Sequence, residues 1–157
     1  MRTRITELLG IAHPVLSPGM TYVSNADLVA AVSKAGGLGI LAVGHLSPEE
    51  TRAEIRRVRS LTDKPFGVGV ALIMPGAAQN AEIAIEEKVP VLNFSLGKGD
   101  WICKRVHAYG GKVRAIRSLT EFSEDWPLDA VINLAGEGIA DRPWSAARKQ
   151  QLHTSRV

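Results

Sequence analysis

The first 112 residues alternate between short apolar segments and segments with the features of amphipathic helices. The apolar segments lie at residues 15–16, 38–43, 66–73 and 89–95. Continuous apolar runs are typical of strands that are buried on both faces, and strands alternating with helices form right-handed βαβ units. The pattern therefore predicts an α/β protein with a parallel sheet.

Helix signals separate the apolar segments. Ser47 is a favourable N-cap, Pro48 suits the first helical position, and Glu50 completes a capping box. The remaining helices are expected on similar signals. One begins at Ser24 or Asn25 and ends at Gly36–Gly37, and a second covers residues 80–87. A third begins at Asp100, which is expected to cap it, and ends at Gly110–Gly111.

Two arrangements of such repeats are possible on pattern alone, an open doubly wound sheet or a (β/α)₈ barrel. A complete barrel needs about 250 residues, whereas this chain has 157. Residues 113–116 resemble the start of a fifth strand. The fold class that we expect is α/β, with parallel βα repeats that form half of a TIM (β/α)₈ barrel.

The character of the sequence changes near residue 117. A polar, acidic stretch covers residues 118–126, residues 128–137 have the pattern of a strand that ends in a glycine turn, and residues 144–153 form a basic, helix-like stretch. We therefore expect two parts: a half barrel over residues 1–112, and a short Rossmann-like strand–helix segment over residues 113–157 that packs on it.

Composition excludes several classes of function. The net charge of +3 is spread over helical segments rather than gathered into a basic run with aromatic residues, so nucleic-acid binding is not expected. The lone Cys103 excludes a multi-thiolate metal site, and the four histidines are far apart, so no metal is expected. Without a long apolar span or the apolar core of a secretory signal, the default expectation is a cytoplasmic protein that does not bind membranes.

Candidate site residues lie where the expected strands end, because ligands of parallel sheets bind at the carboxyl ends of strands. These positions are Gly19, Met20 and Thr21, then Gly44–His45, Gly69–Ala71 and Asn93–Gly99. A glycine there lets the backbone approach a flat ring, and a small polar side chain can bond to the edge of that ring. The simpler alternative is that these residues only form strand-to-helix turns, with His45 a solvated loop residue.

Four segments in the first part carry a resemblance to a known family. They are TRITELLG (residues 3–10), HPVLSPGM (13–20), AAVSKAGGLG (30–39) and TDKPFG (62–67). Residues 3–112 resemble the N-terminal half of the nitronate monooxygenases, also called 2-nitropropane dioxygenases, which are FMN-dependent barrels related to flavin enoyl-ACP reductases. The resemblance implies a flavoprotein oxidoreductase with a small-molecule substrate.

The resemblance also assigns residues. It implies that Gly19, Met20 and Thr21 hold the flavin ring through backbone contacts, and that Asn93 and Ser95 lie at the floor of the site. Gly69 occupies the position at which many relatives carry a flavin-contacting asparagine. No segment here matches the loop of the family's catalytic histidine or the phosphate-binding loops, so catalytic residues are not assigned.

A second resemblance covers residues 113–157. The segments VRAIRSL (113–119), DAVINLAGE (129–137) and the stretch from Trp144 to Val157 resemble an internal part of NAD(P)-dependent epimerase-like proteins of the short-chain dehydrogenase/reductase group. That group's glycine-rich fingerprint and its Tyr-x-x-x-Lys pair have no match in this chain, so dinucleotide binding is not expected.

Three functions remain open on the sequence. The first is a nitronate monooxygenase-like FMN-dependent oxidoreductase that is truncated or chimeric and catalytically impaired. The second is a non-catalytic chimeric α/β scaffold. The third, and least favoured, is an NAD(P)-binding epimerase-like module. A half barrel has two open sheet edges. A homodimer through those edges is therefore a further expectation.

Overall fold

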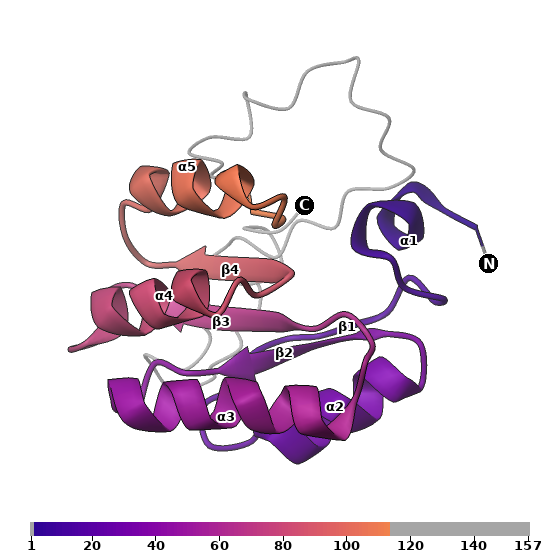
Figure 1. Cartoon of the computed structure of the whole chain (residues 1–157), viewed down its shortest axis with the longest axis horizontal. Coiled ribbons are helices and arrows are strands. Elements are labelled where there is room, and N and C mark those ends of the chain that lie inside the picture. Colours follow the sequence, from indigo (N-terminus) through magenta and orange to yellow (C-terminus); the bar gives the residue numbers. More distant parts are fainter. Residues whose placement is uncertain (1, 114–157) are drawn as a thin grey trace, which may run out of the picture. The chain divides into compact units, whose positions relative to one another are not determined.

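The computed structural model describes residues 2–113 (Figure 1). Their elements follow one another in strict alternation after a first short helix. In chain order they are α1 (Arg4–Leu9), β1 (Leu16–Ser17), α2 (Ala26–Lys34), β2 (Leu38–Ala42), α3 (Pro48–Leu61), β3 (Gly67–Ala71), α4 (Ala77–Glu86), β4 (Val91–Ser95) and α5 (Asp100–Ala108). The segment 114–157, including its expected Rossmann-like strand and helix, lies outside the described residues.

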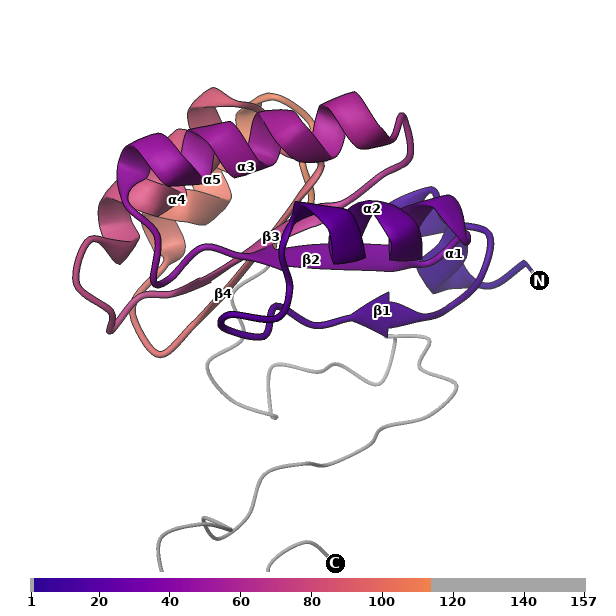
Figure 2. The same cartoon turned by 90° about the horizontal axis from the view of Figure 1, so that it is seen from below.

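The four strands form one parallel sheet in the order β1-β2-β3-β4 (Figure 1). Helices α2, α3, α4 and α5 cover one face of this sheet (Figure 2). A doubly wound sheet places helices on both faces and reverses its strand order, whereas a barrel adds each strand beside the last and keeps its helices outside. The observed order and layering are therefore those of half a (β/α)₈ barrel.

The sheet continues beyond β4. Lys112 forms a parallel bridge with Val91, in which the Leu92 N–H donates to the Lys112 carbonyl at 3.0 Å and the Lys112 N–H donates to the Pro90 carbonyl at 2.9 Å. This bridge lies where a fifth strand was expected to begin. The remainder of that expected strand lies outside the described residues.

Alternation along the strands separates two apolar layers. Leu41, Val43, Val68, Val70 and Leu92 point toward the helices and join the larger buried core. The opposite, concave face carries a smaller cluster of Leu9, Ile11, Leu38 and Ile40, with Val91 packed against it. Helix α1 thus covers the end of the concave face at which β2 and β4 begin.

Local capping explains most helix boundaries. Ser47 and Glu50 form the expected capping box of α3, and Asn25 caps α2 by accepting a hydrogen bond from the Leu28 N–H. Two expectations were wrong in detail. Asp100 is the first residue of α5 rather than its cap, because Gly99 occupies the N-cap position, and α4 begins at Ala77, three residues earlier than expected, after a left-handed Gly76.

Helix α2 packs unusually closely on β2. A Cβ placed on Gly39 would lie 2.5 Å from the Val29 carbonyl oxygen and 2.8 Å from the Val29 Cα. Only a residue without a side chain fits at this crossing, so Gly39 sets the distance between helix and sheet.

An ion-pair network joins α3 to the end of α4. Glu87 has only 9% of its side chain exposed and contacts Arg52, Arg56 and Arg59 at 2.9, 2.9 and 3.1 Å. Burial raises the pKa of the Glu87 carboxyl, but hydrogen bonds from Arg52 and Arg56 outweigh burial and hold that pKa below its ordinary value of 4.5.

Within residues 2–113, no helix is long and apolar enough to cross a membrane.

Candidate functional site

Three of the expected site residues lie on neighbouring strands, Gly69 and Asn93 at the middle of β3 and β4 and Ser95 at the carboxyl end of β4. Gly69 on β3 is the register partner of Ala42 on β2 and of Asn93 on β4, and Ala71 is the partner of Ser95. Because register partners in a sheet point to the same face, Gly69, Asn93 and Ser95 all lie on the concave face, opposite the helices. The structure thus brings these three residues onto one face, and their contact with a cofactor stays a prediction.

The loop after β1 closes over the same face. A Cβ placed on Gly19 would lie 3.6 Å from the Ala42 Cβ and 3.6 Å from Ile40 Cγ2. A Cβ placed on Gly69 would lie 3.2 Å from Ile40 Cγ2 and 3.8 Å from the Gly19 Cα. Gly19 and Gly69 therefore face each other across the end of β2, and the Ile40 side chain is close to both positions.

The floor of this surface is flat because its residues are small. Ala42, Gly67, Gly69 and Ala71 supply at most a methyl group each at the concave face of β2 and β3. Bare backbone of this kind allows a planar ring to approach closely.

Polar groups border the flat floor on one side. The side chains of Asn93 and Ser95 are exposed and make no hydrogen bond with the described residues. Asn93 also lines a cavity of about 610 Å³ on the concave face, whose other walls include Leu16, Ile40 and Val91. The Asn93 amide is thus presented, unpaired, at the edge of an apolar hollow.

The β1–α2 loop holds Met20 differently from its neighbours. The Met20 N–H donates to Ser24 Oγ at 3.0 Å, and Ser24 Oγ donates to the Pro18 carbonyl at 2.9 Å. The N–H groups of Gly19 and Thr21 have no partner among the described residues. Of the three backbone donors expected here, the Met20 N–H is therefore used inside the loop, and the other two are left for a ligand.

One feature of this end of the molecule was missed from the sequence. His45 was expected to be solvated, but it is half-buried, and its Nδ1 is buried without a hydrogen-bond partner among the described residues. Its ring lies 4.5 Å from that of Tyr22, measured between centroids. Nothing in the sequence marks Tyr22, whose contact with His45 depends on how two loops fold together.

No metal site accompanies these residues. Among residues 2–113, His, Cys, Asp and Glu do not gather into any group of three that could hold a metal ion.

Comparison with known proteins decides the family. A sequence profile described as nitronate monooxygenase matches residues 2–147. The chain belongs to the nitronate monooxygenase family. A nitronate monooxygenase from Pseudomonas aeruginosa is 49% identical over 81 residues, which cover 52% of this chain and 23% of the relative.

A longer alignment exists with another relative. The (3aS,4S,5R,7aS)-5-hydroxy-7a-methyl-1-oxo-octahydro-1H-indene-4-carboxyl-CoA dehydrogenase of Mycobacterium tuberculosis is 38% identical over 141 residues, which cover 88% of this chain and 40% of the relative. The chain therefore spans about two fifths of the length of this relative. The nitronate monooxygenase profile continues past residue 113, whereas the resemblance of residues 113–157 to epimerase-like proteins stays a prediction.

Solved structures agree with the half-barrel assignment. FabK from Thermotoga maritima superposes with a TM-score of 0.68 at 44% identity, covering 71% of this chain and 36% of FabK. Nitroalkane oxidase from Streptomyces ansochromogenes superposes with a TM-score of 0.63 at 26% identity, covering 69% of this chain and 41% of that protein. Members of the nitronate monooxygenase family and FabK-type proteins are flavin enzymes in general.

Proposed function

We propose that residues 2–113 form the flavin-ring surface of an FMN-dependent oxidoreductase of the nitronate monooxygenase type. The observation that carries the proposal is the pairing of bare backbone at Gly69 with the exposed amide of Asn93 on the next strand. Family membership supports the class of cofactor. FMN, its orientation and the reaction are parts of the proposal.

The residues present fit a flat, partly polar ring. The floor of Ala42, Gly69 and Ala71 presents only methyl groups and backbone, and a Cβ at Gly69 would already meet Ile40 Cγ2 at 3.2 Å. The Asn93 amide can donate a hydrogen bond to the edge of the ring or accept one from it. The Ser95 hydroxyl can do the same from the next position of β4 on this face. The free N–H groups of Gly19 and Thr21 complete the set of donors on the other side.

A flavin bound here would supply the electron-accepting centre for oxidation of a small substrate. The chain's own residues then bind and orient. Ala42, Gly69, Ala71, Asn93 and Ser95 contain no group that titrates near neutral pH, so proton removal is assigned to none of them. We therefore propose that these five residues bind and orient the ring, and that a family member with this surface alone is catalytically impaired.

Riboflavin tests the proposal at the level of the ring, because it carries the flavin ring without the phosphate. We expect the chain to quench riboflavin fluorescence in a saturable manner, and the Gly69→Leu variant to lose this quenching because its side chain occupies the ring surface. Gly44→Ala is the matched control, since a Cβ there would meet Met74 Cγ at an ordinary 3.6 Å. Absence of quenching by the folded wild-type chain would contradict the proposal and favour a non-catalytic scaffold.

A further inference from the structure

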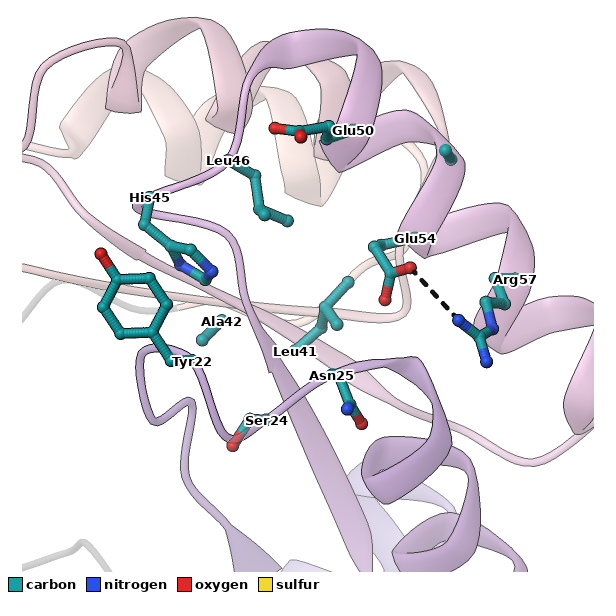
Figure 3. A pocket seen from close by; sticks show the side chains of 11 residues that line it. Tyr22, Ser24, Asn25, Leu41, Ala42, His45, Leu46, Glu50, Glu54 and Arg57 are labelled. Atoms are coloured by element: carbon teal, nitrogen blue, oxygen red, sulfur yellow. Dashed lines mark ion pairs between the residues drawn. The ribbon is translucent and has the colours of Figure 1, made fainter.

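A second pocket lies on the other side of β2, where the helices pack. It has a volume of about 300 Å³ and lies between the loop that precedes α2 and the first turns of α3 (Figure 3). Its apolar surface comes from Leu41, Ala42, Leu46 and Ala53. None of the six residues expected to contact a flavin lines it. Ala42, which belongs to the proposed flavin floor, also lines this pocket, so the two sites meet at the end of β2.

The polar group that distinguishes this pocket is the imidazole of His45. Figure 3 shows it between Tyr22 and the apolar side chains of Leu41 and Leu46. Its Nδ1 is buried and has no hydrogen-bond partner among the described residues. Leaving a buried polar atom unpaired is unfavourable by about 1–3 kcal/mol. Because Nδ1 is covered, a ligand in the pocket contacts the imidazole through the rest of its ring.

Tyr22 forms the outer lip of the pocket under backbone strain. Its φ of 64° lies in the left-handed region, which is unfavourable for a residue with a large side chain. The conformation keeps the ring against His45, with the ring planes tilted by 58°. Strain of this kind persists at ligand clamps, where the surrounding structure holds the residue in place.

The charge of the pocket is negative. Of its charged residues, Glu50 and Glu54 are acidic and Arg57 is basic. Arg57 donates to both oxygens of Asp27 at 2.9 and 2.7 Å and lies 3.8 Å from Glu54 Oε1. Glu50 makes one hydrogen bond, from the Ser47 N–H at 2.8 Å, and has no ion pair with the described residues. Glu54 Oε2 accepts a hydrogen bond from the Ala26 N–H at 3.0 Å. The arginine is thus already paired with Asp27, and the charges of Glu50 and Glu54 leave the pocket negative.

We propose that this pocket binds a small organic cation, a protonated amine carried on a compact apolar or aromatic body. The ammonium group donates to the carboxylates of α3, and its body covers Leu41, Leu46 and the His45 ring. The exposed Tyr22 ring adds a cation–π contact at about 6 Å or less. A carboxylate or phosphate ligand is disfavoured by Glu50 and Glu54, and the volume lies at the lower end of the usual range of about 300–1,000 Å³ for ligand pockets.

Three probes of similar shape and different charge test the proposal on the full chain. Benzylamine is a cation, benzyl alcohol is neutral and benzoate is an anion at neutral pH. We expect benzylamine, titrated in NMR spectra, to shift the ring resonances of His45 and Tyr22 in a saturable manner, and the other two probes to bind at least about fivefold more weakly. Equal binding of the three probes, or no shift at His45 and Tyr22, would overturn the proposal.

Two variants on α3 distinguish direct contact with the cation in the pocket from the effect of the overall charge of the chain. Glu50→Gln removes a pocket charge but keeps an oxygen that can accept from the Ser47 N–H, because glutamine also completes a capping box. Glu49→Gln removes the same charge from the neighbouring exposed position outside the pocket. We expect Glu50→Gln to weaken benzylamine binding about fivefold and Glu49→Gln to leave it unchanged. Equal effects of the two variants would refute a site at this pocket.

Discussion

Gly69 and Asn93 are register partners on β3 and β4, so a position without a side chain lies directly beside an exposed amide on the concave face. Many relatives are expected to carry their flavin-contacting asparagine at the position of Gly69. In this chain the nearest amide lies one strand further along the sheet. If the proposed flavin binds at this face, we expect Asn93 on β4 to supply the hydrogen bond that Gly69 cannot.

Moving the amide from position 93 to position 69 tests whether one position can replace the other. Asn93→Ala should weaken flavin binding about fivefold to tenfold, because one hydrogen bond contributes about 1 kcal/mol. Gly69→Asn combined with Asn93→Ala should recover most of that loss. Both effects are measured by fluorescence titration with riboflavin. The exposed Gln79 on α4 provides a control, since Gln79→Ala should change nothing. No loss in Asn93→Ala would remove Asn93 from the site.

Gly39→Ala should strongly destabilise the fold. The added Cβ would lie 2.5 Å from the Val29 carbonyl oxygen, so α2 must move away from β2. Overpacking of this kind lowers the free energy of unfolding by about 1–3 kcal/mol or more. Gly44→Ala, which makes an ordinary contact, should stay within about 0.5 kcal/mol of the wild type in urea denaturation. Similar values for both variants would contradict the close packing of α2.

Asn80 connects α4 to the loop that carries His45. It is fully buried, and its Nδ2 donates to the Val43 and Leu46 carbonyls at 2.7 and 2.8 Å. Asn80→Leu leaves the Leu46 carbonyl without this donor, whereas the Val43 carbonyl keeps the hydrogen bond from the Leu46 N–H at 3.2 Å. We expect a loss of about 1–3 kcal/mol in the free energy of unfolding. The His45 ring resonances should shift in the same variant, even under conditions in which it remains folded. Unchanged His45 signals would mean that Asn80 does not position this loop.

Glu87→Gln should lower the stability at neutral pH by about 1–2 kcal/mol, because three arginines at the α3–α4 contact lose their common carboxylate. The control is Glu49→Gln, whose side chain is exposed on the first turn of α3. Urea denaturation measures both variants. A loss no larger than that of the control would show that this network does not stabilise the fold.

The same carboxylate gives a pH dependence with a defined sign. Because the pKa of Glu87 is held below 4.5 in the folded chain, its contribution is fully present above that value and is lost as the pH falls through the lowered pKa. The difference in stability between the wild type and Glu87→Gln should therefore shrink below about pH 4.5. A difference that grows on acidification would contradict the lowered pKa.

Local signals in the sequence predicted most of the described elements. Strand β2 and helix α3 lie where they were expected, because each depends on residues that are neighbours in the sequence. These are the apolar run from Leu38 to Val43 for β2 and the capping box of Ser47 and Glu50 for α3. Helix α1 was not expected, because its capping box uses Thr3 and Thr6 rather than a glutamate or glutamine at the third position. Its closing signal, Gly10 at a φ of 68°, could have indicated it.

The site was predictable only in part, for a physical reason. Strand ends can be read from the sequence, so Gly69, Asn93 and Ser95 were placed on one surface. The facing of Gly19 and Gly69 depends on how a loop crosses the sheet, and the contact between Tyr22 and His45 depends on two loops from different repeats. Such relationships are set by tertiary packing and leave no periodic pattern in the chain.

The most direct test is the visible absorption spectrum of the purified chain after incubation with excess FMN and removal of unbound flavin. Flavin bands in stoichiometric amount, lost in Gly69→Leu and retained in Gly44→Ala, are the result that we predict. A colourless wild-type chain that is folded by circular dichroism would contradict a flavin surface on the concave face.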